Sequence, residues 1–518
     1  MGGILASRLL GFLREWTVAH QVGSNASTDA FYAAFTLPDF LNYLVAGASL
    51  SATFIPVFAK YSAEGREDES WWVFSTVMTF MGALLAGLIV VGEIFAPQLA
   101  HVIAPGFAPA ETTRLIFLTR LMLPAQFCFY EGSILSAVQY AKGRFLIPSL
   151  APVVYNVLIV LGGFLLASRI GMTGFALGVL VGALLGNFLL QVYGAISVGA
   201  RFRPNLNLRH PGFILFLRLS IPIMLALSLV FTDDWITRWF ASYMQPASIT
   251  WLNYGKMLMR VPLGVVGQGV GVASFPFLAQ LYSEGKIEEL NRLLNSTMKW
   301  LIALLVPVSA LTIAQSVPLV YLVFAHTRLR GPDFDATAAT LVFFSLGMFA
   351  WGAQNILARG FYATRNTLIP AVAGTALALA NLPVYWFLAH RAQHIGLALA
   401  SSIGITAYTV VLFVLLNRRT HNREAGAITL FFVKVCAASA AVAWVCHRLQ
   451  LFLEPHFAWH AMTGAFALLV IVTTVGVALL LIAAKLLGIR EFDELIARAR
   501  KMNRGEADTV LPIAPTNL

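Results

Sequence analysis

Charged side chains stand inside stretches that are mostly apolar, and four of them are cations whose types suit the binding of an anion. Arg8 and Arg14 lie in the first stretch, Asp29 opens the second, and Lys256 and Arg260 lie in a later one. Arginine binds phosphate through a planar fork of donors, and lysine supplies a mobile point charge. Because residues four apart stack on one face of a helix, Lys256 and Arg260 predict a single cationic patch.

Placing these charges in lipid would be costly, at about 2.5–3.5 kcal/mol each, so we expect them to face a cavity or a partner. Six residues separate Arg8 from Arg14, which is about 240° of helix rotation, so together they suit a broad cavity. The pattern predicts an anion-binding chamber with cations from both halves of the chain. The alternative is that the cations extend to the membrane interface or pair with Asp29, Asp39 and Glu15.

The composition shows what kind of protein must position these residues. Of the 518 residues, 58% are hydrophobic and 11% are charged, whereas soluble domains carry about 25% charged residues. This excludes a disordered chain and argues against a cytosolic enzyme. The net charge of +11 fits basic cytoplasmic loops better than binding to nucleic acid. Three scattered cysteines predict neither a disulfide framework nor a metal site.

Fourteen apolar stretches are long enough to span a membrane, which takes about 20 residues. They are too long and continuous for a β-barrel. Charges interrupt the first stretch, so it is not a cleavable signal peptide. With a cytoplasmic N-terminus, the inner loops carry fourteen Lys and Arg against six outside, which predicts that both termini are cytoplasmic. The stretches lie near 2–22, 29–60, 71–96, 113–140, 145–168, 172–198, 212–241, 248–282, 293–315, 336–364, 367–389, 394–417, 425–446 and 459–487.

An internal repeat divides the chain. The residues Ile134-Leu135, Tyr140-Ala141 and Leu146-Ile147-Pro148 recur 222 positions later as Ile356-Leu357, Tyr362-Ala363 and Leu368-Ile369-Pro370. The repeat predicts two six-helix lobes, 1–205 and 206–422, followed by two helices in 423–488 and an amphipathic cytoplasmic tail in 489–518. Parallel repeats of this kind are typical of transporters that bind substrate between their lobes and work by alternating access.

Prolines inside apolar stretches predict kinks, because proline cannot donate the helical hydrogen bond. Pro38 and Pro262 are such positions, and glycines including Gly267 follow Pro262 closely. We expect these three residues to act as hinges. The glycine cluster is not a phosphate loop, since no strand precedes it and no GKS or GKT follows.

The sequence carries no motif for catalysis. HExxH, GxSxG and a P-loop are missing, and the ten histidines are scattered. A membrane acyl- or glycosyltransferase would need an Asp/His constellation on a loop, and none is evident. A membrane scaffold would not explain Arg and Lys within the apolar stretches. We therefore expect a transporter rather than an enzyme, with no cofactor and with coupling to the membrane potential or a monovalent ion.

Three segments resemble the MurJ/MviN family of bacterial lipid II flippases, in the MOP exporter superfamily. The opening Ser7-Arg8-Leu9-Leu10-Gly11-Phe12-Leu13-Arg14-Glu15 resembles that of the family, as does Thr28-Asp29-Ala30-Phe31. The segment Leu252-Asn253-Tyr254 followed by Val261-Pro262-Leu263-Gly264-Val265 is similar to a signature of its second lobe. The resemblance spans the chain.

This resemblance implies an all-α bundle of fourteen helices with a cationic cavity for a pyrophosphate and sugar-peptide headgroup. It implies that 423–488 forms a groove for the polyprenyl tail, that the substrate is undecaprenyl-pyrophosphoryl disaccharide-pentapeptide, and that the protein lies in the bacterial inner membrane. Arg8, Arg14 and Asp29 match the family's cavity residues, whereas Asn42, Gly47 and Met257 depart from its pattern. The alternative function is export of another lipid-linked oligosaccharide or of drugs.

Overall fold

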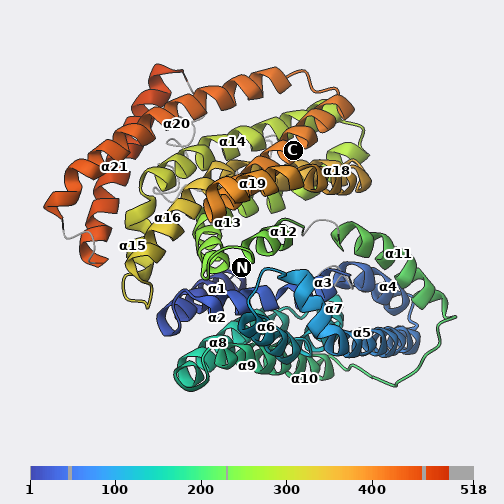
Figure 1. The fold of residues 1–518 in the computed structure, drawn as a ribbon. Coiled ribbons are helices and arrows are strands. Elements are labelled where there is room, and N and C mark those ends of the chain that lie inside the picture. Colours follow the sequence, from blue (N-terminus) through green and yellow to red (C-terminus); the bar gives the residue numbers. More distant parts are fainter. Residues whose placement is uncertain (1, 45–49, 229–231, 458–461, 489–518) are drawn as a thin grey trace. The chain divides into compact units, whose positions relative to one another are not determined.

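A computed structural model describes residues 2–44, 50–228, 232–457 and 462–488, and helices are the regular elements throughout these ranges (Figure 1). Helices satisfy every backbone group within the segment, which an apolar surrounding requires. Eight helices in these ranges are long and apolar enough to span a membrane, or nine if the bent pair Gly331–Leu346 and Met348–Ala363 is one span. The expected all-α membrane fold is confirmed, and the count of fourteen spans stays a prediction.

The chain forms two compact units. The first unit comprises Met1–Thr250 and Thr327–Leu329, and the second comprises Trp251–His326 and Arg330–Leu518. The expected amphipathic tail, 489–518, lies outside the described residues.

The first unit contains twelve α-helices and one π-helix among its described residues, and the start of another α-helix. Helices α8 and α9 lie side by side, and α7 packs against α4, α5 and the π-helix. A buried aromatic cluster of Phe54, Phe58, Trp71, Phe74 and Phe216 joins α4, α5 and α11. The elements are α1 (Gly2–Gln21), α2 (Ala26–Ala34), α3 (Thr36–Leu44), α4 (Leu50–Ala63), α5 (Glu67–Ile103), α6 (Pro109–Met122), α7 (Ala125–Ala141), α8 (Leu146–Ile170), α9 (Met172–Gly182), the π-helix (Ala183–Leu189), α10 (Leu190–Ser197), α11 (Pro211–Ser228) and α12 (Thr232–Ala241).

The second unit contains most of the long helix α13 (Ser248–Ser283), which begins in the first unit. Within the second unit α14 packs against α17 and α20, and α21 packs against α15 and α20. Helix α19 is broken at Ala392 and Gln393. The remaining elements are α14 (Ile287–Ala314), α15 (Ser316–Phe324), α16 (Gly331–Leu346), α17 (Met348–Ala363), α18 (Leu368–Ala380), α19 (Leu382–Arg419), α20 (Ala425–Leu453), a 3₁₀ turn (Glu454–His456) and α21 (Met462–Leu486).

Helix boundaries recur at the spacing of the sequence repeat. Helix α7 ends at Ala141 and α17 at Ala363, and α8 begins at Leu146 and α18 at Leu368. Left-handed backbone conformations recur in the same way, in five pairs 220 to 224 positions apart. The pairs are Gly23 and Ala247, Gly65 and Gly285, Gly143 and Arg365, Gly171 and Gln393, and Gly199 and His421. At four of the five positions, the second copy has a residue other than the glycine that this conformation favours.

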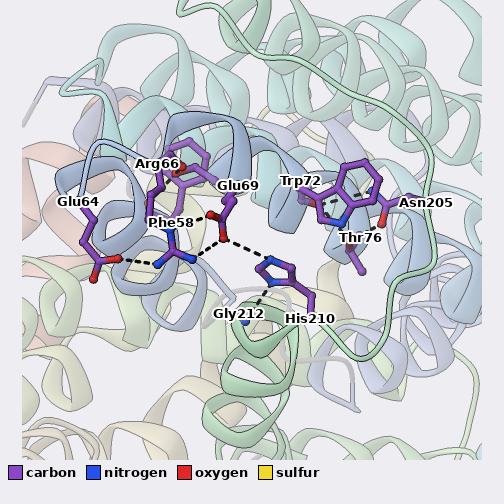
Figure 2. Close-up of polar contacts among 10 residues, drawn as sticks. Phe58, Glu64, Arg66, Glu69, Trp72, Thr76, Asn205, His210 and Gly212 are labelled. Carbon is purple, nitrogen blue, oxygen red and sulfur yellow. Dashed lines mark hydrogen bonds and ion pairs between the residues drawn. The ribbon is translucent and has the colours of Figure 1, made fainter.

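The segment that follows α10 is held against the start of α5 by hydrogen bonds and an ion pair (Figure 2). Ser75 accepts a hydrogen bond from the backbone N–H of Arg203 (3.0 Å), and Thr76 donates one to Asn205. At the end of the segment, His210 Nδ1 accepts from Gly212 N–H (3.1 Å), and its Nε2 lies 3.7 Å from Glu69 Oε2. These contacts hold the beginning of α11 beside α5. We call this set of contacts the first strap.

Ion pairs reinforce the first strap. Arg66 precedes α5 and donates to Glu69 (2.6 Å) and to Glu64 (2.9 Å), as Figure 2 shows. The hydrogen bonds that Arg66 donates, first to Glu69 and then to Glu64, raise the pKa of Arg66 above its ordinary value, so the guanidinium stays charged. The pairs are exposed to solvent, which screens them, so they contribute little to stability.

The second unit contains a corresponding strap made from amides. Asn291 of α14 donates to the backbone carbonyl of Thr420 (2.8 Å), just after α19 ends. Asn295 donates to Glu424 (3.0 Å) and accepts from Asn422 (2.7 Å). We call these contacts the second strap. In each predicted lobe, the strap joins the segment after the sixth predicted span to the start of the third.

The π-helix Ala183–Leu189 lies directly against Gly132 of α7. A Cβ added at Gly132 would come within 1.6 Å of the carbonyl oxygen of Asn187, which is backbone and cannot turn away. We expect Gly132→Ala to lower the melting temperature of the purified protein, since overpacking costs about 1–3 kcal/mol or more. Gly87→Ala in α5 is the control, because a Cβ there meets nothing within 4 Å. Equal melting temperatures for the two variants would contradict this packing.

Candidate functional site

Arg14 is held by an acidic residue beside it in α1. Its Nη2 and Nε donate to Glu15 Oε1 at 2.5 and 3.1 Å, and the Arg14 side chain remains 28% exposed. The other carboxylate oxygen, Glu15 Oε2, accepts from the hydroxyl of Tyr32 in α2 (2.7 Å). Glu15 itself is buried. The carboxylate therefore fixes one side of the guanidinium and leaves part of it accessible for an anion.

Arg8 lies earlier on α1 and is exposed. Helix α1 packs along α8, and the buried side of α1 carries Thr17, Val18 and Ala19. Arg8 and Arg14 thus lie in one helix of the first unit, as the sequence predicts.

Asp29 binds the first turn of α13 within the first unit. Its Oδ1 accepts from the backbone N–H of Thr250 (2.8 Å) and from the Thr250 hydroxyl (2.5 Å), and its Oδ2 accepts from the backbone N–H of Ala247 (2.7 Å). The side chain is 3% exposed. A carboxylate at a helix N-terminus satisfies donors that have no partner in the helix and complements the helix dipole.

These hydrogen bonds show what Asp29, the predicted cavity acid, contacts in the first unit. It joins α2 to the start of the helix that carries Lys256 and Arg260. Thr28 beside it contacts the same residue, Thr250, hydroxyl to hydroxyl at 2.9 Å. Sequence reasoning missed Thr250, because nothing in the sequence links two positions 221 residues apart other than the approximate repeat spacing.

A second acid–base contact follows in α3. Arg238 of α12 lies 3.7 Å from Asp39 and donates to the hydroxyl of Thr36 (3.0 Å). This contact holds α12 against α3 in the first unit. Asp29, Asp39 and Glu15 were the alternative partners expected for the cations, and among the described residues Arg14 is hydrogen-bonded to Glu15.

Lys256 and Arg260 occupy contrasting surroundings on α13. Lys256 is 7% exposed, and its Nζ lies 5.1 Å from the ring centre of Trp351 and 5.5 Å from that of Phe344. Arg260, one turn later, is exposed. Aromatic rings attract a cation through their negative faces. The aromatic pair, on α17 and α16, could not be foreseen from sequence spacing.

The predicted hinge residues lie inside helices. Pro38 is in α3, directly after the break between α2 and α3 at Phe35, and Pro262 is inside α13 together with Pro276. Gly267 also falls in α13, within 265–274, whose side chains lie outside the described residues.

The site contains cations and acids but no grouping of metal ligands in the described part of the chain. No three His, Cys, Asp or Glu side chains gather there in a way that could hold a metal ion. The candidate cations are Arg8 and Arg14 in the first unit, and Lys256 and Arg260 in the second. An arginine guanidinium and a lysine ammonium group both suit the binding of an oxyanion.

Comparison with known proteins places the chain among characterised families. The model of the family "Lipid II flippase MurJ" matches residues 18–463. A lipid II flippase MurJ from Burkholderia cenocepacia is 27% identical over 455 residues, covering 86% of this chain and 88% of the relative. A probable lipid II flippase MurJ from Rhizobium tropici is 28% identical over 510 residues, covering 94% of this chain and 93% of the relative.

Solved structures match the fold. A structure titled lipid II flippase MurJ, inward closed conformation, aligns with a TM-score of 0.77 at 20% identity, covering 95% of this chain and 98% of the other. An inward-facing multidrug resistance MATE transporter of the MOP superfamily aligns with a TM-score of 0.64 at 15% identity, covering 82% of this chain and 95% of the other. The apolar helices and the family match indicate a multi-pass inner-membrane protein of a transporter family. This chain belongs to the lipid II flippase MurJ family.

Proposed function

We propose that this protein is a lipid II flippase, which moves the lipid-linked peptidoglycan precursor from the inner to the outer leaflet of the cytoplasmic membrane by alternating access. The observation that carries the proposal is the family match over residues 18–463. The cations on α1 and α13 support it, because they sit in apolar helices where a structural role alone would be expensive.

In this proposal Arg8, Arg14, Lys256 and Arg260 bind the pyrophosphate. A diphosphate carries at least two negative charges, and removing it from water demands cations nearby. Glu15 orients Arg14 for this contact. Asp29 acts by position, because it holds the first turn of the helix that carries the second pair of cations.

The organisation of the chain follows the same proposal. Residues 1–205 and 206–422 form the two lobes, which alternate around the headgroup by bending at Pro38, Pro262 and Gly267. Residues 423–488 form the groove for the polyprenyl tail, and 489–518 lie on the inner membrane surface. Fourteen spans place both termini in the cytoplasm. Transport uses no cofactor and draws on the membrane potential or a monovalent ion.

Depletion of the protein in its host tests the function. Accumulation of lipid II followed by lysis, reversed by expression of the intact chain, is the expected result. Survival with loss of a different surface glycan would indicate the alternative, an exporter of another lipid-linked oligosaccharide. Reconstitution with lipid II in vesicles then measures the transfer directly, as loss of the labelled headgroup from the leaflet to which it was added.

The cations on α13 make a prediction of their own. Lys256→Ala and Arg260→Ala should each slow transport about tenfold or more, since a charge-assisted hydrogen bond contributes about 1.5–3 kcal/mol. The double variant should lose less than the sum, because groups that act on one ligand couple. Lys256→Arg should be tolerated, whereas Arg260→Lys should impair transport if Arg260 binds bidentately.

The control for these variants is Lys286→Ala, which removes an exposed lysine paired with Glu284 just after α13. It should leave transport unchanged. Cysteine labelling supplies the structural check: reagents that reach neither position 256 nor 260 from either side of the membrane would show that the pair faces packed protein, contrary to a role in binding substrate.

A further inference from the structure

Glu131 is a buried carboxyl in the middle of α7 that the binding of the headgroup does not use. It is 2% exposed. Helices α6 and α7 together form one apolar span, Pro109–Ala141, and α7 packs against α4, α5, α10 and the π-helix. An acid in such a position is expensive and is expected to have a function.

The packing leaves a specific place for this carboxyl. A Cβ added at Gly82 of α5 would lie 2.8 Å from Glu131 Oε1 and 3.6 Å from the ring of Phe127. The carboxyl therefore lies against bare backbone, next to an aromatic ring. At position 82 only glycine leaves room for the acid, because every other residue type carries a Cβ.

Glu131 has no counter-charge among the residues that the structure describes. Its Oε1 has no hydrogen-bond partner, and no described cation forms an ion pair with it. Neighbouring Tyr130 is 3% exposed, and its hydroxyl is also unpartnered. The other described ionisable groups on helices packed against α7 are Asp39 on α3, Lys60 and Tyr61 on α4, Glu67, Asp68, Glu69, Glu93 and His101 on α5, Tyr155 and Arg169 on α8, and Tyr193 on α10.

None of those groups forms a hydrogen bond or ion pair with Glu131. Asp39 and Glu93 have their own partners in Arg238 and Arg120, and Lys60 is exposed at the end of α4. An ionised carboxylate at this position would be a buried charge without compensation, whereas the neutral acid is an ordinary polar group.

The element facing α7 at this level is the π-helix. The carbonyl of Asn187 occupies the space beside Gly132, the residue next to Glu131, and the Asn187 amide nitrogen is buried without a partner. Phe188 of the same turn contacts Phe127, with ring centres 6.1 Å apart. A π-helix inside a helical span is rare and is frequent at functional sites. The described part of α7 and of the π-helix thus contains three buried polar atoms without a partner, on Tyr130, Glu131 and Asn187.

A proton is the ligand that this place suits. A single carboxyl against a glycine backbone and a phenyl ring offers too few oxygen atoms to coordinate a metal cation, and no grouping of metal ligands occurs in the described ranges. Protonation needs one oxygen only and removes the charge that the surroundings do not compensate.

We propose that Glu131 is a proton-binding site in the first unit and that its protonation is coupled to the transport cycle. The acid is neutral while α5, α7 and the π-helix pack as they do here, and it releases its proton when these helices separate and water enters. The coupling to transport rests on the proposed flippase function, whereas the proton site itself does not.

Difference infrared spectroscopy of the full-length protein in lipid bilayers tests the site without any substrate. A carbonyl band of a protonated carboxylic acid should persist at neutral pH and vanish in Glu131→Gln. Glu93→Gln is the matched control, since Glu93 lies in α5 beside Arg120. It should keep the band. If Glu131→Gln does not accumulate, Gly82→Ala should shift the band by displacing the carboxyl. An unchanged band in Glu131→Gln, or no such band in the intact protein, would overturn the proposal.

Vesicles that contain lipid II test the coupling. A pH gradient should accelerate transfer by the intact protein and by Glu93→Gln, and it should have no effect on Glu131→Gln. A Glu131→Gln variant that still responds fully to the gradient would overturn the coupling. If the intact protein transfers no lipid II, the flippase function fails, and the infrared result still decides whether Glu131 binds a proton.

Discussion

Cells that depend on this protein should stop growing when Arg14 is replaced with alanine. The substitution removes a guanidinium that is partly exposed and held in place by Glu15, and it leaves the Glu15 carboxylate without that cation. The site then loses attraction for a diphosphate and gains an uncompensated negative charge, so both effects act in the same direction. Complementation of a flippase-depleted strain should fall to background, with normal amounts of protein in the membrane.

Arg14→Lys separates charge from geometry. Lysine restores the positive charge but not the planar fork, so partial activity is expected if Arg14 binds phosphate with two donors. The control is Arg114→Ala, an exposed arginine of α6 outside the candidate site. Arg8→Ala should also abolish complementation. Full activity of both Arg8→Ala and Arg14→Ala would refute the assignment of α1 to the binding site.

Replacing Asp29 with alanine should lower both the stability of the protein and its transport. The change leaves the backbone N–H groups of Ala247 and Thr250 without their acceptor. A buried donor that loses its partner costs about 1–3 kcal/mol, and here two are affected. The start of α13 should then loosen. We expect a lower melting temperature in detergent and loss of complementation.

Asp29→Asn should be milder, because the amide keeps one oxygen as an acceptor while it loses the charge that complements the helix dipole. Asp335→Ala is the control, since Asp335 also lies near the start of a helix, α16, but is exposed. Unchanged melting temperature in Asp29→Ala would show that water or another group replaces the carboxylate, and the positioning role would be wrong.

Much of the fold was predictable because lipid imposes simple requirements on a sequence. Long apolar stretches predict helices, and the family resemblance is confirmed by the match over 18–463, which includes the segment around Pro262. The type of the site residues was also readable, since a charge in an apolar stretch is conspicuous. The number of spans was not settled in this way, because several helices are bent or broken, as at Phe35 and Gln393.

The partners of those charges could not be predicted, because they come from distant parts of the chain. The residues around Lys256 include Phe344 and Trp351, far along the sequence, and aromatic residues are too common to indicate a contact. Asp29 reads as a cavity acid until the start of α13 is seen beside it. Glu131 was missed although a signal existed, namely a lone acid between Cys128 and Ile134 in an apolar span.

The five paired left-handed turns have a practical consequence for handling this protein. In the second copy, the left-handed positions are occupied by Ala247, Arg365, Gln393 and His421 where the first copy has glycine. Each of these residues therefore adopts a backbone conformation that costs about 1–2 kcal/mol for a residue with a side chain. Glycine at these positions would relieve that strain, against an entropic penalty of about 0.5–1 kcal/mol. The glycines of the first copy thus suggest four replacements in the second copy that should raise the melting temperature and help purification and crystallisation.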